Sequence, residues 1–372
     1  MTERIPLAMP DLRGNEAKYV LDAIESTWIS SSGRYVTQFE AEFARVSGSR
    51  HALAVCNGTV ALHLALLGLD VRPGDEVLVP SLTYIATANA VRYVGGVPVF
   101  VEVDPDTWCM DPLAIEEKIT NRTKGIIPVH LYGHPADMDA INHLAAVHGL
   151  WVVEDAAEAP FATYKGRATG GLAQIATFSF YGNKVLTSGE GGAVTFNDDR
   201  MLTRLRMLRG QGMDPDRRYY FPITGYNYRL TNLACALLCA QLERGAEMLA
   251  RRRALVVRYN AALKRVEGIG VQPVAPWAEV SPWLYCALVD EQAYGHSRDE
   301  LMAHLDANGV ETRPFFIPLH TLPPFRLEAE ARDTHLPVTD RLSLSGLNLP
   351  TFTQMSDAQV DRVCELVAGF KA

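Results

Sequence analysis

The sequence predicts an α/β protein, with a large, mostly parallel mixed sheet between layers of helices and a smaller α+β part at the C-terminus. Apolar runs of strand length alternate with segments of helix length up to Phe196, a rhythm typical of a sheet wrapped by helices on both faces. A long helical pattern follows, and beyond Gly268 strands and helices mix in another order. With 372 residues, the chain is long enough for two domains and a large core.

The first part of the chain contains the predicted elements of the large sheet and its helices. Their order is the βαβ rhythm of parallel sheets. Helices are expected over residues 16–27, 36–46, 60–69, 83–93 and 137–148. Strands are expected over residues 51–55, 76–79, 97–103, 125–129, 150–153, 176–180 and 192–196.

A single long helix is expected to join two domains. Thr231-Asn232 is a strong N-cap pair, and a helical pattern runs from there to about Lys264. This helix is long enough to connect a large domain, residues 1–245, with a small one, residues 246–372.

The small domain has signals of its own. A proline-rich stretch at 271–282 precedes a strand expected at 283–289. Capping boxes at Ser297–Glu300 and Ser356–Gln359 mark the starts of two helices.

Composition and charge favour a globular protein without a nucleic-acid or membrane partner. Hydrophobic residues make up 48% of the chain and charged residues 21%, the balance of a soluble domain. The net charge of −8 would not draw the molecule to nucleic acid or to an anionic membrane. No run of about 18 apolar residues occurs, and the first residues lack the apolar segment of a signal peptide, so we expect a cytoplasmic protein.

Cysteine and histidine spacing predicts no metal site. Cys235 and Cys239 are four residues apart, as are His130 and His134, a spacing that can suit a metal on a helix. Neither pair has further ligands nearby, and Tyr132-Gly133 favours a loop between the histidines. We therefore expect buried thiols and no bound metal.

Lys184 is the most informative residue of the chain. It follows a predicted strand and lies between the glycines of Gly182-Asn183-Lys184 and Gly189-Glu190-Gly191. An isolated lysine in a glycine-rich turn is ordinarily an exposed surface residue. A desolvated lysine amine, however, is the usual group that forms a Schiff base with a carbonyl, including that of pyridoxal phosphate.

Two other motifs suit the same cofactor. Asp155 ends an apolar strand, where ligands of open α/β sheets collect, and a carboxylate there could keep a pyridinium nitrogen protonated. A helix cap is the alternative role for this aspartate. Asn57-Gly58-Thr59 joins a strand to a helix, so its free N–H groups could bind a phosphate, or Thr59 could simply cap the helix.

Five motifs follow one another along the chain: Asn57–Thr59, Pro80–Tyr84, Val153–Ala159, Phe178–Lys184 and Gly225–Arg229. Together they resemble the sugar-nucleotide aminotransferases of the DegT/StrS family, which are fold-type I pyridoxal-phosphate enzymes. The resemblance covers essentially the whole chain.

The resemblance implies a role for each motif. Lys184 would form the Schiff base with pyridoxal phosphate and, once freed, move the proton as general acid and base. A lysine here, rather than the histidine of relatives that dehydrate sugars, implies amino transfer. Asp155 would hold the ring nitrogen. Tyr84 would stack on the ring, unless it is a core residue of the expected helix at 83–93.

The remaining cofactor contacts also come from the resemblance. Gly58, Thr59 and Ser179 would hold the phosphate. Glu158 would lie near the phenolic oxygen of the cofactor, where two negative charges repel unless one group is protonated. Asn227 would reach the phosphate of the neighbouring subunit, which implies a homodimer with shared active sites.

Three runs, residues 27–31, 209–218 and 311–320, are closest to family members that aminate C4 of a GDP-linked 4-keto-6-deoxymannose. L-Glutamate would be the amino donor. The Phe316–His320 segment lies among three prolines and would form a wall of the sugar pocket, although core phenylalanines and a surface histidine are the alternative. The residues expected to contact the nucleotide sugar are Trp28, Ser30, Arg217, Arg229, Phe316 and His320.

Other functions remain as alternatives. C3 aminotransferases and enzymes of dTDP-sugars lie close by in the same family. An amino-acid transaminase shares the fold but needs an arginine for the α-carboxylate, which Arg313 could supply. A relative that senses ligands without catalysis is the binding-protein alternative. Gly210-Gln211-Gly212 lacks the third glycine of a Rossmann dehydrogenase and does not follow a strand.

Overall fold

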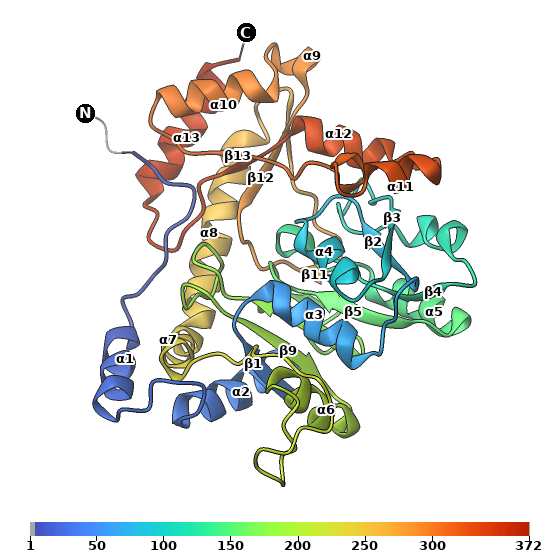
Figure 1. Cartoon of the computed structure of the whole chain (residues 1–372). Helices are drawn as coiled ribbons and strands as arrows, with labels where there is room; N and C mark the ends of the chain where they lie inside the picture. The colour runs from blue at the N-terminus through green and yellow to red at the C-terminus, as the bar shows by residue number, and fades with distance from the viewer. Residues whose placement is uncertain (1–3, 372) are drawn as a thin grey trace.

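The computed structural model describes residues 4–371 and is built around a sheet of seven strands (Figure 1). The strand order is β1-β9-β8-β5-β4-β2-β3, in which β9 runs antiparallel to both neighbours and the other pairs are parallel. The predicted mixed, mostly parallel sheet is therefore confirmed. Its strands are β1 (His51–Val55), β2 (Glu76–Pro80), β3 (Val97–Val101), β4 (Thr123–Ile126), β5 (Trp151–Asp155), β8 (Ile175–Ser179) and β9 (Gly192–Phe196).

Helices connect and cover these strands. The α-helices are α1 (Glu16–Glu25), α2 (Arg34–Val46), α3 (Gly58–Gly68), α4 (Ala86–Tyr93), α5 (Met138–His148), α6 (Asp199–Arg209), α7 (Asn232–Glu243), α8 (Gly245–Leu263), α9 (Glu291–Tyr294), α10 (Arg298–Ala307), α11 (Arg326–Ala331), α12 (Pro337–Ser345) and α13 (Asp357–Gly369). The 3-10 helices are η1 (Pro112–Ala114), η2 (Glu116–Lys118), η3 (Leu131–Gly133) and η4 (Leu319–Thr321). Within residues 4–371, no helix is both long and apolar enough to cross a lipid bilayer.

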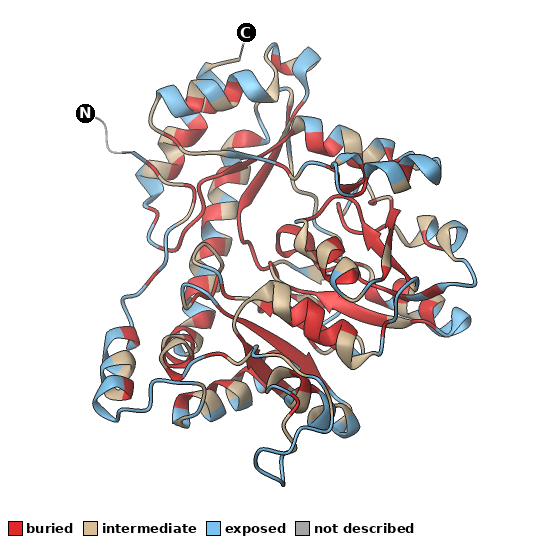
Figure 2. Cartoon of the chain, in the orientation of Figure 1, coloured by how far each residue is buried: buried red, intermediate tan, exposed pale blue. Residues whose placement is uncertain are grey.

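Both faces of the large sheet are buried (Figure 2), because helices pack on each of them and successive side chains of a strand point to opposite faces. Val153 of β5 packs in a core with residues of α3, α4 and α6, whereas Val152 packs with residues of α5. Ala54 of β1 belongs to a third core with α2 and α7. Burial on both faces explains the near-continuous apolar runs of these strands.

A second sheet is antiparallel and comes from the C-terminal part of the chain. Its order is β10-β12-β14-β13, and α8, α10 and α13 share its apolar core. A third, small sheet pairs β11 with β6, far apart in the sequence, and β6 with β7. The strands are β6 (Thr163–Tyr164), β7 (Arg167–Ala168), β10 (Ile269–Val271), β11 (Ala278–Glu279), β12 (Tyr285–Val289), β13 (Arg313–Pro314) and β14 (Gly346–Leu349).

The expected single helix from Thr231 to Lys264 is wrong, since the structure has two helices, α7 and α8. The chain turns between them at Arg244, with φ −107° and ψ 4°. Gly245 packs so closely on Phe161 that an added Cβ would lie 2.5 Å from the ring. The helical periodicity of the sequence continues across this break, so the pattern could not reveal it. The division into domains at residue 245 stays a prediction. Ile5, which was assigned to the large domain, packs with the core of the second sheet.

The starts of α3 and α4 differ from expectation, whereas those of α10 and α13 agree with it. Asn57, rather than Thr59, caps α3, because its side chain accepts a 3.0 Å hydrogen bond from the N–H of Val60. Helix α4 begins at Ala86, which leaves Tyr84 in the preceding loop. Both predicted capping boxes are confirmed, at the starts of α10 and α13.

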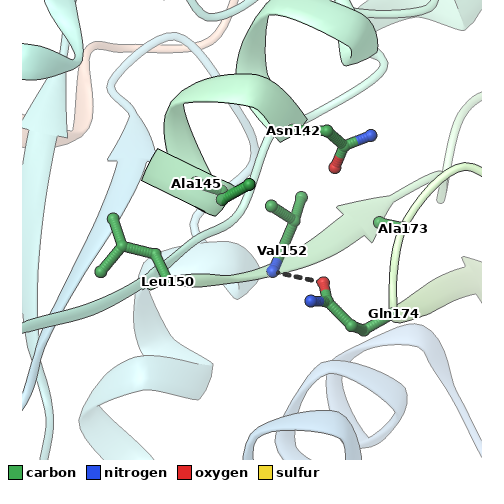
Figure 3. Close-up of a pocket in the computed structure, with 7 residues that line it drawn as sticks. Asn142, Ala145, Leu150, Val152, Ala173 and Gln174 are labelled. Atoms are coloured by element: carbon green, nitrogen blue, oxygen red, sulfur yellow. Dashed lines mark hydrogen bonds between the residues drawn. The ribbon is translucent and has the colours of Figure 1, made fainter. Parts of the chain in front are cut away.

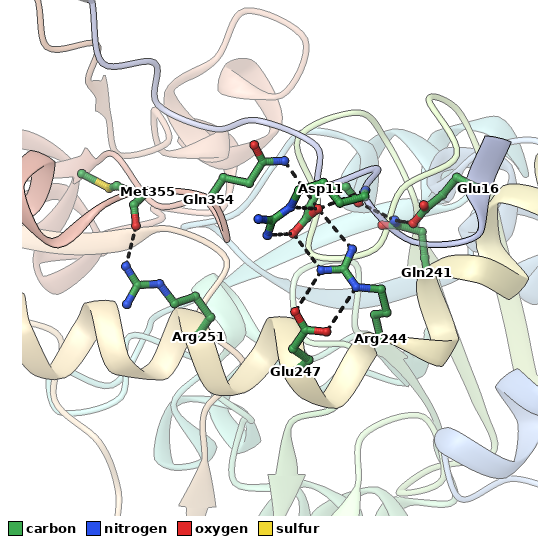
Figure 4. A network of polar contacts seen from close by, with 9 residues as sticks. Asp11, Glu16, Gln241, Arg244, Glu247, Arg251, Gln354 and Met355 are labelled. Atoms are coloured by element: carbon green, nitrogen blue, oxygen red, sulfur yellow. Dashed lines mark hydrogen bonds and ion pairs between the residues drawn. The ribbon is translucent and has the colours of Figure 1, made fainter.

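Asp11 ties the N-terminal segment to the junction of α7 and α8 (Figure 4). Its carboxylate accepts hydrogen bonds from Arg13, at 2.7 and 2.9 Å, and from Arg244, at 3.1 and 3.2 Å. Its side chain is only 2% exposed. The hydrogen bonds and charges of the two guanidinium groups hold the pKa of Asp11 well below its usual range.

We expect Asp11→Asn to lower the free energy of unfolding at pH 7 by about 1–3 kcal/mol, because the buried Asp11 carboxylate loses its charge-assisted hydrogen bonds to Arg13 and Arg244. Since the folded-state pKa of Asp11 is lowered, its contribution is present above the unfolded pKa and is lost as the pH falls through the folded value. The difference between the two proteins should therefore shrink below about pH 4. Denaturant titrations at several pH values measure it.

The control for this prediction is Asp306→Asn. Asp306 pairs with Arg4 at 2.8 Å, but both side chains are exposed, so the expected loss is below about 1 kcal/mol. Equal losses in the two variants would contradict the account of Asp11.

Candidate active site

A cavity of about 480 Å³ lies at the carboxyl ends of the central strands of the large sheet. Residues at the ends of β5 and β8, and others two to four positions after β1 and β2, line it, as expected for the ligand site of an open α/β sheet. All the predicted cofactor residues except Asn227 contribute to its lining. They are Gly58, Thr59, Tyr84, Asp155, Glu158, Ser179 and Lys184.

Lys184 lies in a turn after β8, where its N–H donates a 2.9 Å hydrogen bond to the carbonyl of Tyr181. Its side chain is 12% exposed, and its Nζ lies 3.6 Å from Oε1 of Glu158. Burial lowers the pKa of the Lys184 amine, while the carboxyl groups of Glu158 and Asp155 oppose that shift. A buried amine with a lowered pKa is suited to attack a carbonyl carbon and to carry a proton.

Asp155 is the last residue of β5, and its side chain is buried in the cavity wall. Oδ2 accepts a 2.8 Å hydrogen bond from the hydroxyl of Thr87 on α4, and Oδ1 accepts one of 3.2 Å from the N–H of Ala157. Burial raises the pKa of this carboxyl group, and these two hydrogen bonds oppose the rise. A buried carboxyl group facing a cavity fits a cationic ring nitrogen.

Glu158 is buried beside Lys184. Its Oε2 accepts a 2.7 Å hydrogen bond from the N–H of Tyr132 in η3. Burial raises the pKa of Glu158, and the ammonium of Lys184 opposes that rise.

The start of α3 is a site for an anion. The side chain of Asn57 accepts a hydrogen bond from the N–H of Val60. The N–H groups of Gly58 and Thr59, in contrast, have no acceptor within residues 4–371. Ser179, at the end of β8, packs directly on Gly58, since an added Cβ at Gly58 would lie 2.8 Å from the Ser179 Cβ. Free N–H groups at a helix start beside a hydroxyl fit a phosphate group.

Aromatic residues form another part of the cavity wall. Tyr84 is 59% exposed, and its ring centroid lies 6.0 Å from that of Phe316. Phe316 itself lines the cavity, as does Arg313 of β13, which the sequence analysis considered for a carboxylate.

His320 does not line this cavity, contrary to expectation. The prolines around it shape the short helix η4, in which the His320 ring is buried against other groups. Its Nδ1 makes a 2.8 Å hydrogen bond with the hydroxyl of Ser81, and its Nε2 lies 3.4 Å from Asp340. The ring nitrogens therefore face Ser81 and Asp340 instead of the cavity.

Of the predicted sugar contacts, Phe316 lines the cavity, whereas four others lie outside the cavity of their own chain: Trp28, Ser30, Arg217 and Arg229. Trp28 and Ser30 are exposed after α1, and their carbonyls accept hydrogen bonds from Asn232. Arg217 stacks on Tyr220 in an exposed loop. Asn227 is exposed and Arg229 half-buried.

Thr87, Tyr181 and Trp283 also line the cavity, although no sequence pattern assigned them to the site. Thr87 lies in the first turn of α4. The expected helix at 83–93 included this residue, but no motif there indicated a contact with Asp155. Trp283 is the first residue of the strand expected at 283–289. Its place at the start of a strand was therefore predicted, but its contact with Lys184 was not.

The cysteines are free thiols, and Cys235 and Cys239 are buried on α7. His130 bonds Glu154 at 3.1 Å, and His134 bonds the carbonyl of Pro135 at 2.8 Å. No group of three or more potential metal ligands occurs within residues 4–371.

Another cavity, of about 320 Å³, lies between α5 and β5 (Figure 3). Its polar side chains are already engaged, because Asn142 donates to the carbonyl of Leu172 and Gln174 accepts from the N–H of Val152. It offers no titratable group, and the chemistry therefore belongs to the larger cavity.

The chain matches the DegT/DnrJ/EryC1/StrS aminotransferase family over residues 10–368, and it belongs to that family. It is 49% identical to a GDP-perosamine synthase of Caulobacter vibrioides over 361 residues, 97% of this chain and 96% of that protein. It is 40% identical to a dTDP-3-amino-3,4,6-trideoxy-alpha-D-glucose transaminase of Streptomyces venezuelae over 373 residues, 98% of this chain and 96% of that protein. The crystal structure of S. venezuelae DesV in complex with a ketimine intermediate has a TM-score of 0.92 at 38% identity and covers 99% of both chains.

The enzyme class follows from the family and the structural neighbours: the chain is a pyridoxal-phosphate-dependent sugar aminotransferase. The predicted family, fold class and cofactor are therefore confirmed.

Proposed function

We propose that the enzyme transfers an amino group from L-glutamate to C4 of GDP-4-keto-6-deoxymannose, giving GDP-perosamine. The observation that carries this proposal is the cavity in which the Lys184 amine, the Asp155 carboxyl group and the free start of α3 lie together. The 49% identity to the Caulobacter vibrioides synthase supports GDP and C4. A dTDP-linked sugar or amination at C3 is the second candidate, which the 40% identity to the Streptomyces venezuelae transaminase favours.

Residues on several sides of the cavity would hold the cofactor. The N–H groups of Gly58 and Thr59 and the Ser179 hydroxyl would bind its phosphate. Asp155 would pair with the ring nitrogen, and Tyr84 would stack on the ring. When bound, pyridoxal phosphate supplies an electron sink for the carbon that loses its proton.

Lys184 would move the proton. Its buried amine, with a pKa lowered by burial, can take a proton at Nζ and release it again. Glu158 lies close enough to hold the resulting ammonium. Because burial raises its own pKa, Glu158 can also carry a proton, which would relieve its repulsion with the phenolic oxygen of the cofactor.

The outer part of the cavity suits the two substrates. Tyr84 and Phe316 would contact the apolar methyl group of a 6-deoxysugar. Arg313 has a half-exposed side chain and only a 3.8 Å ion pair with Glu311, so it is available for a carboxylate of L-glutamate.

A homodimer with shared active sites is part of the proposal, as is a cytoplasmic location. Asn227 lies outside the cavity of its own chain and is exposed, which is compatible with a contact to a neighbouring subunit. Arg229, two residues on, has a buried Nε without a hydrogen-bond partner within residues 4–371. Trp28, Ser30 and Arg217 would meet the nucleotide sugar only in such an assembly.

The function is tested by incubating the purified enzyme with L-glutamate and a panel of GDP- and dTDP-linked 3-keto and 4-keto sugars, with products read by mass spectrometry. We expect amination of GDP-4-keto-6-deoxymannose in preference to the other sugars. Lys184→Ala is the catalytic control and should fold normally but lose more than about 100-fold in turnover, because the general acid and base is gone. Preferred amination of a dTDP-sugar would instead favour the second candidate.

The shared active site predicts complementation between inactive subunits. Lys184→Ala and Asn227→Ala subunits should each be impaired alone, but a mixed dimer contains one site with both native residues. We therefore expect activity to rise above that of either parent after subunit exchange. If mass spectrometry confirms the exchange and activity does not rise, Asn227 does not act across subunits.

A further inference from the structure

Trp283 contacts the lysine of the active site in two ways. Nζ of Lys184 lies 3.7 Å from the centroid of the Trp283 ring, within the range of a cation–π interaction. The indole N–H donates a 2.8 Å hydrogen bond to the carbonyl of Asn183, the residue before the lysine. The ring therefore touches the amine and also holds the loop that carries it.

Arg252 of α8 holds the main chain of Trp283 from behind. Its Nη1 donates hydrogen bonds to the carbonyls of Trp283 at 2.8 Å, Thr351 at 3.1 Å and Pro282 at 3.4 Å. Arg252 is 2% exposed, and it forms no ion pair within residues 4–371. Because burying a guanidinium without an anion is costly, its carbonyl partners must stay in place, and the position of Trp283 is fixed with them.

The groups around the Lys184 amine come from several elements. Asp155 and Glu158 face it from the end of β5, and Trp283 faces it from the segment before β12. Glu190 of the lysine loop and Arg313 of β13 also line the cavity. The carboxyl groups can exchange protons with the amine, whereas an aromatic face attracts a cation without accepting its proton.

We propose that Trp283 is a catalytic residue whose ring binds the free Lys184 amine and stabilises its ammonium form. This interaction keeps the released lysine inside the cavity during the steps in which it carries a proton. Trp283 and Arg252 both follow Arg244 in the chain, whereas Lys184 follows a strand of the large sheet. The segment after Arg244 would therefore raise the proton affinity of a lysine that the large sheet carries.

The test measures the pKa of Lys184 itself rather than turnover. The full-length enzyme is loaded with pyridoxamine 5′-phosphate, which has an amine in place of the aldehyde and so leaves the lysine free. The rate at which an acylating reagent labels Lys184 is followed by peptide mass spectrometry over a range of pH. We expect Trp283→Leu to lower this pKa by about 0.4 to 1.5 units, the range of a cation–π interaction converted at about 1.36 kcal/mol per unit.

Two further variants make the result decisive. Trp283→Phe keeps an aromatic face and should lower the pKa less than Trp283→Leu does. Trp277→Leu is the matched control, because Trp277 packs on Tyr164 and His134 outside the cavity and should leave the pKa of Lys184 unchanged.

An unchanged pKa in Trp283→Leu would overturn the proposal. So would a higher pKa, because the ring would then act only by keeping water from the amine. If Trp283→Leu does not fold, the comparison of Trp283→Phe with the native enzyme decides: a lower pKa supports the proposal, and an unchanged or higher pKa contradicts it.

Discussion

The active site depends on three buried titratable side chains, those of Asp155, Glu158 and Lys184. Two carboxyl groups and an amine can be buried together only if each has partners that replace water. The amine has the two carboxyl groups and the ring of Trp283, whereas the carboxyl groups have the hydroxyl of Thr87 and main-chain N–H groups. These partners come from the ends of parallel strands, from α4 and from the segment before β12. The positions of those elements therefore determine the charge of the site.

The chemistry of the large sheet could be predicted from sequence because its motifs are local. Asp155 ends an apolar strand, and Gly58 stands where a strand turns into a helix, so strand and helix signals alone placed both at the carboxyl edge of a sheet. The surroundings of the His320 ring could not be predicted, because they depend on Ser81, 239 residues away, and on Asp340. The break at Arg244 was missed for a similar reason: the contacts at this point, such as the close packing of Gly245 on Phe161, are with residues far away in the sequence.

The cavity is completed by residues that no local pattern connects with the cofactor. Trp283, Arg313 and Phe316 follow α8 and reach the cavity only because the four-stranded sheet packs beside the carboxyl edge of the large one. Polar contacts stabilise this arrangement, since Arg252 holds the main chain at Trp283 and Asp11 binds the start of α8. The positions of Arg252, Trp283 and Asp11 in the sequence do not indicate these contacts. From the sequence, only the segment around Phe316 and His320 could be proposed as a wall of the substrate pocket.

The central claim is that the buried Lys184 amine is the group that bonds the cofactor. The most direct measurement is reduction of the pyridoxal-phosphate-loaded enzyme with borohydride, followed by peptide mapping by mass spectrometry. The account predicts that the phosphopyridoxyl label is found on Lys184, because its amine combines burial, a lowered pKa and a place in the cavity. A label on another lysine, with Lys184 unmodified, would contradict it.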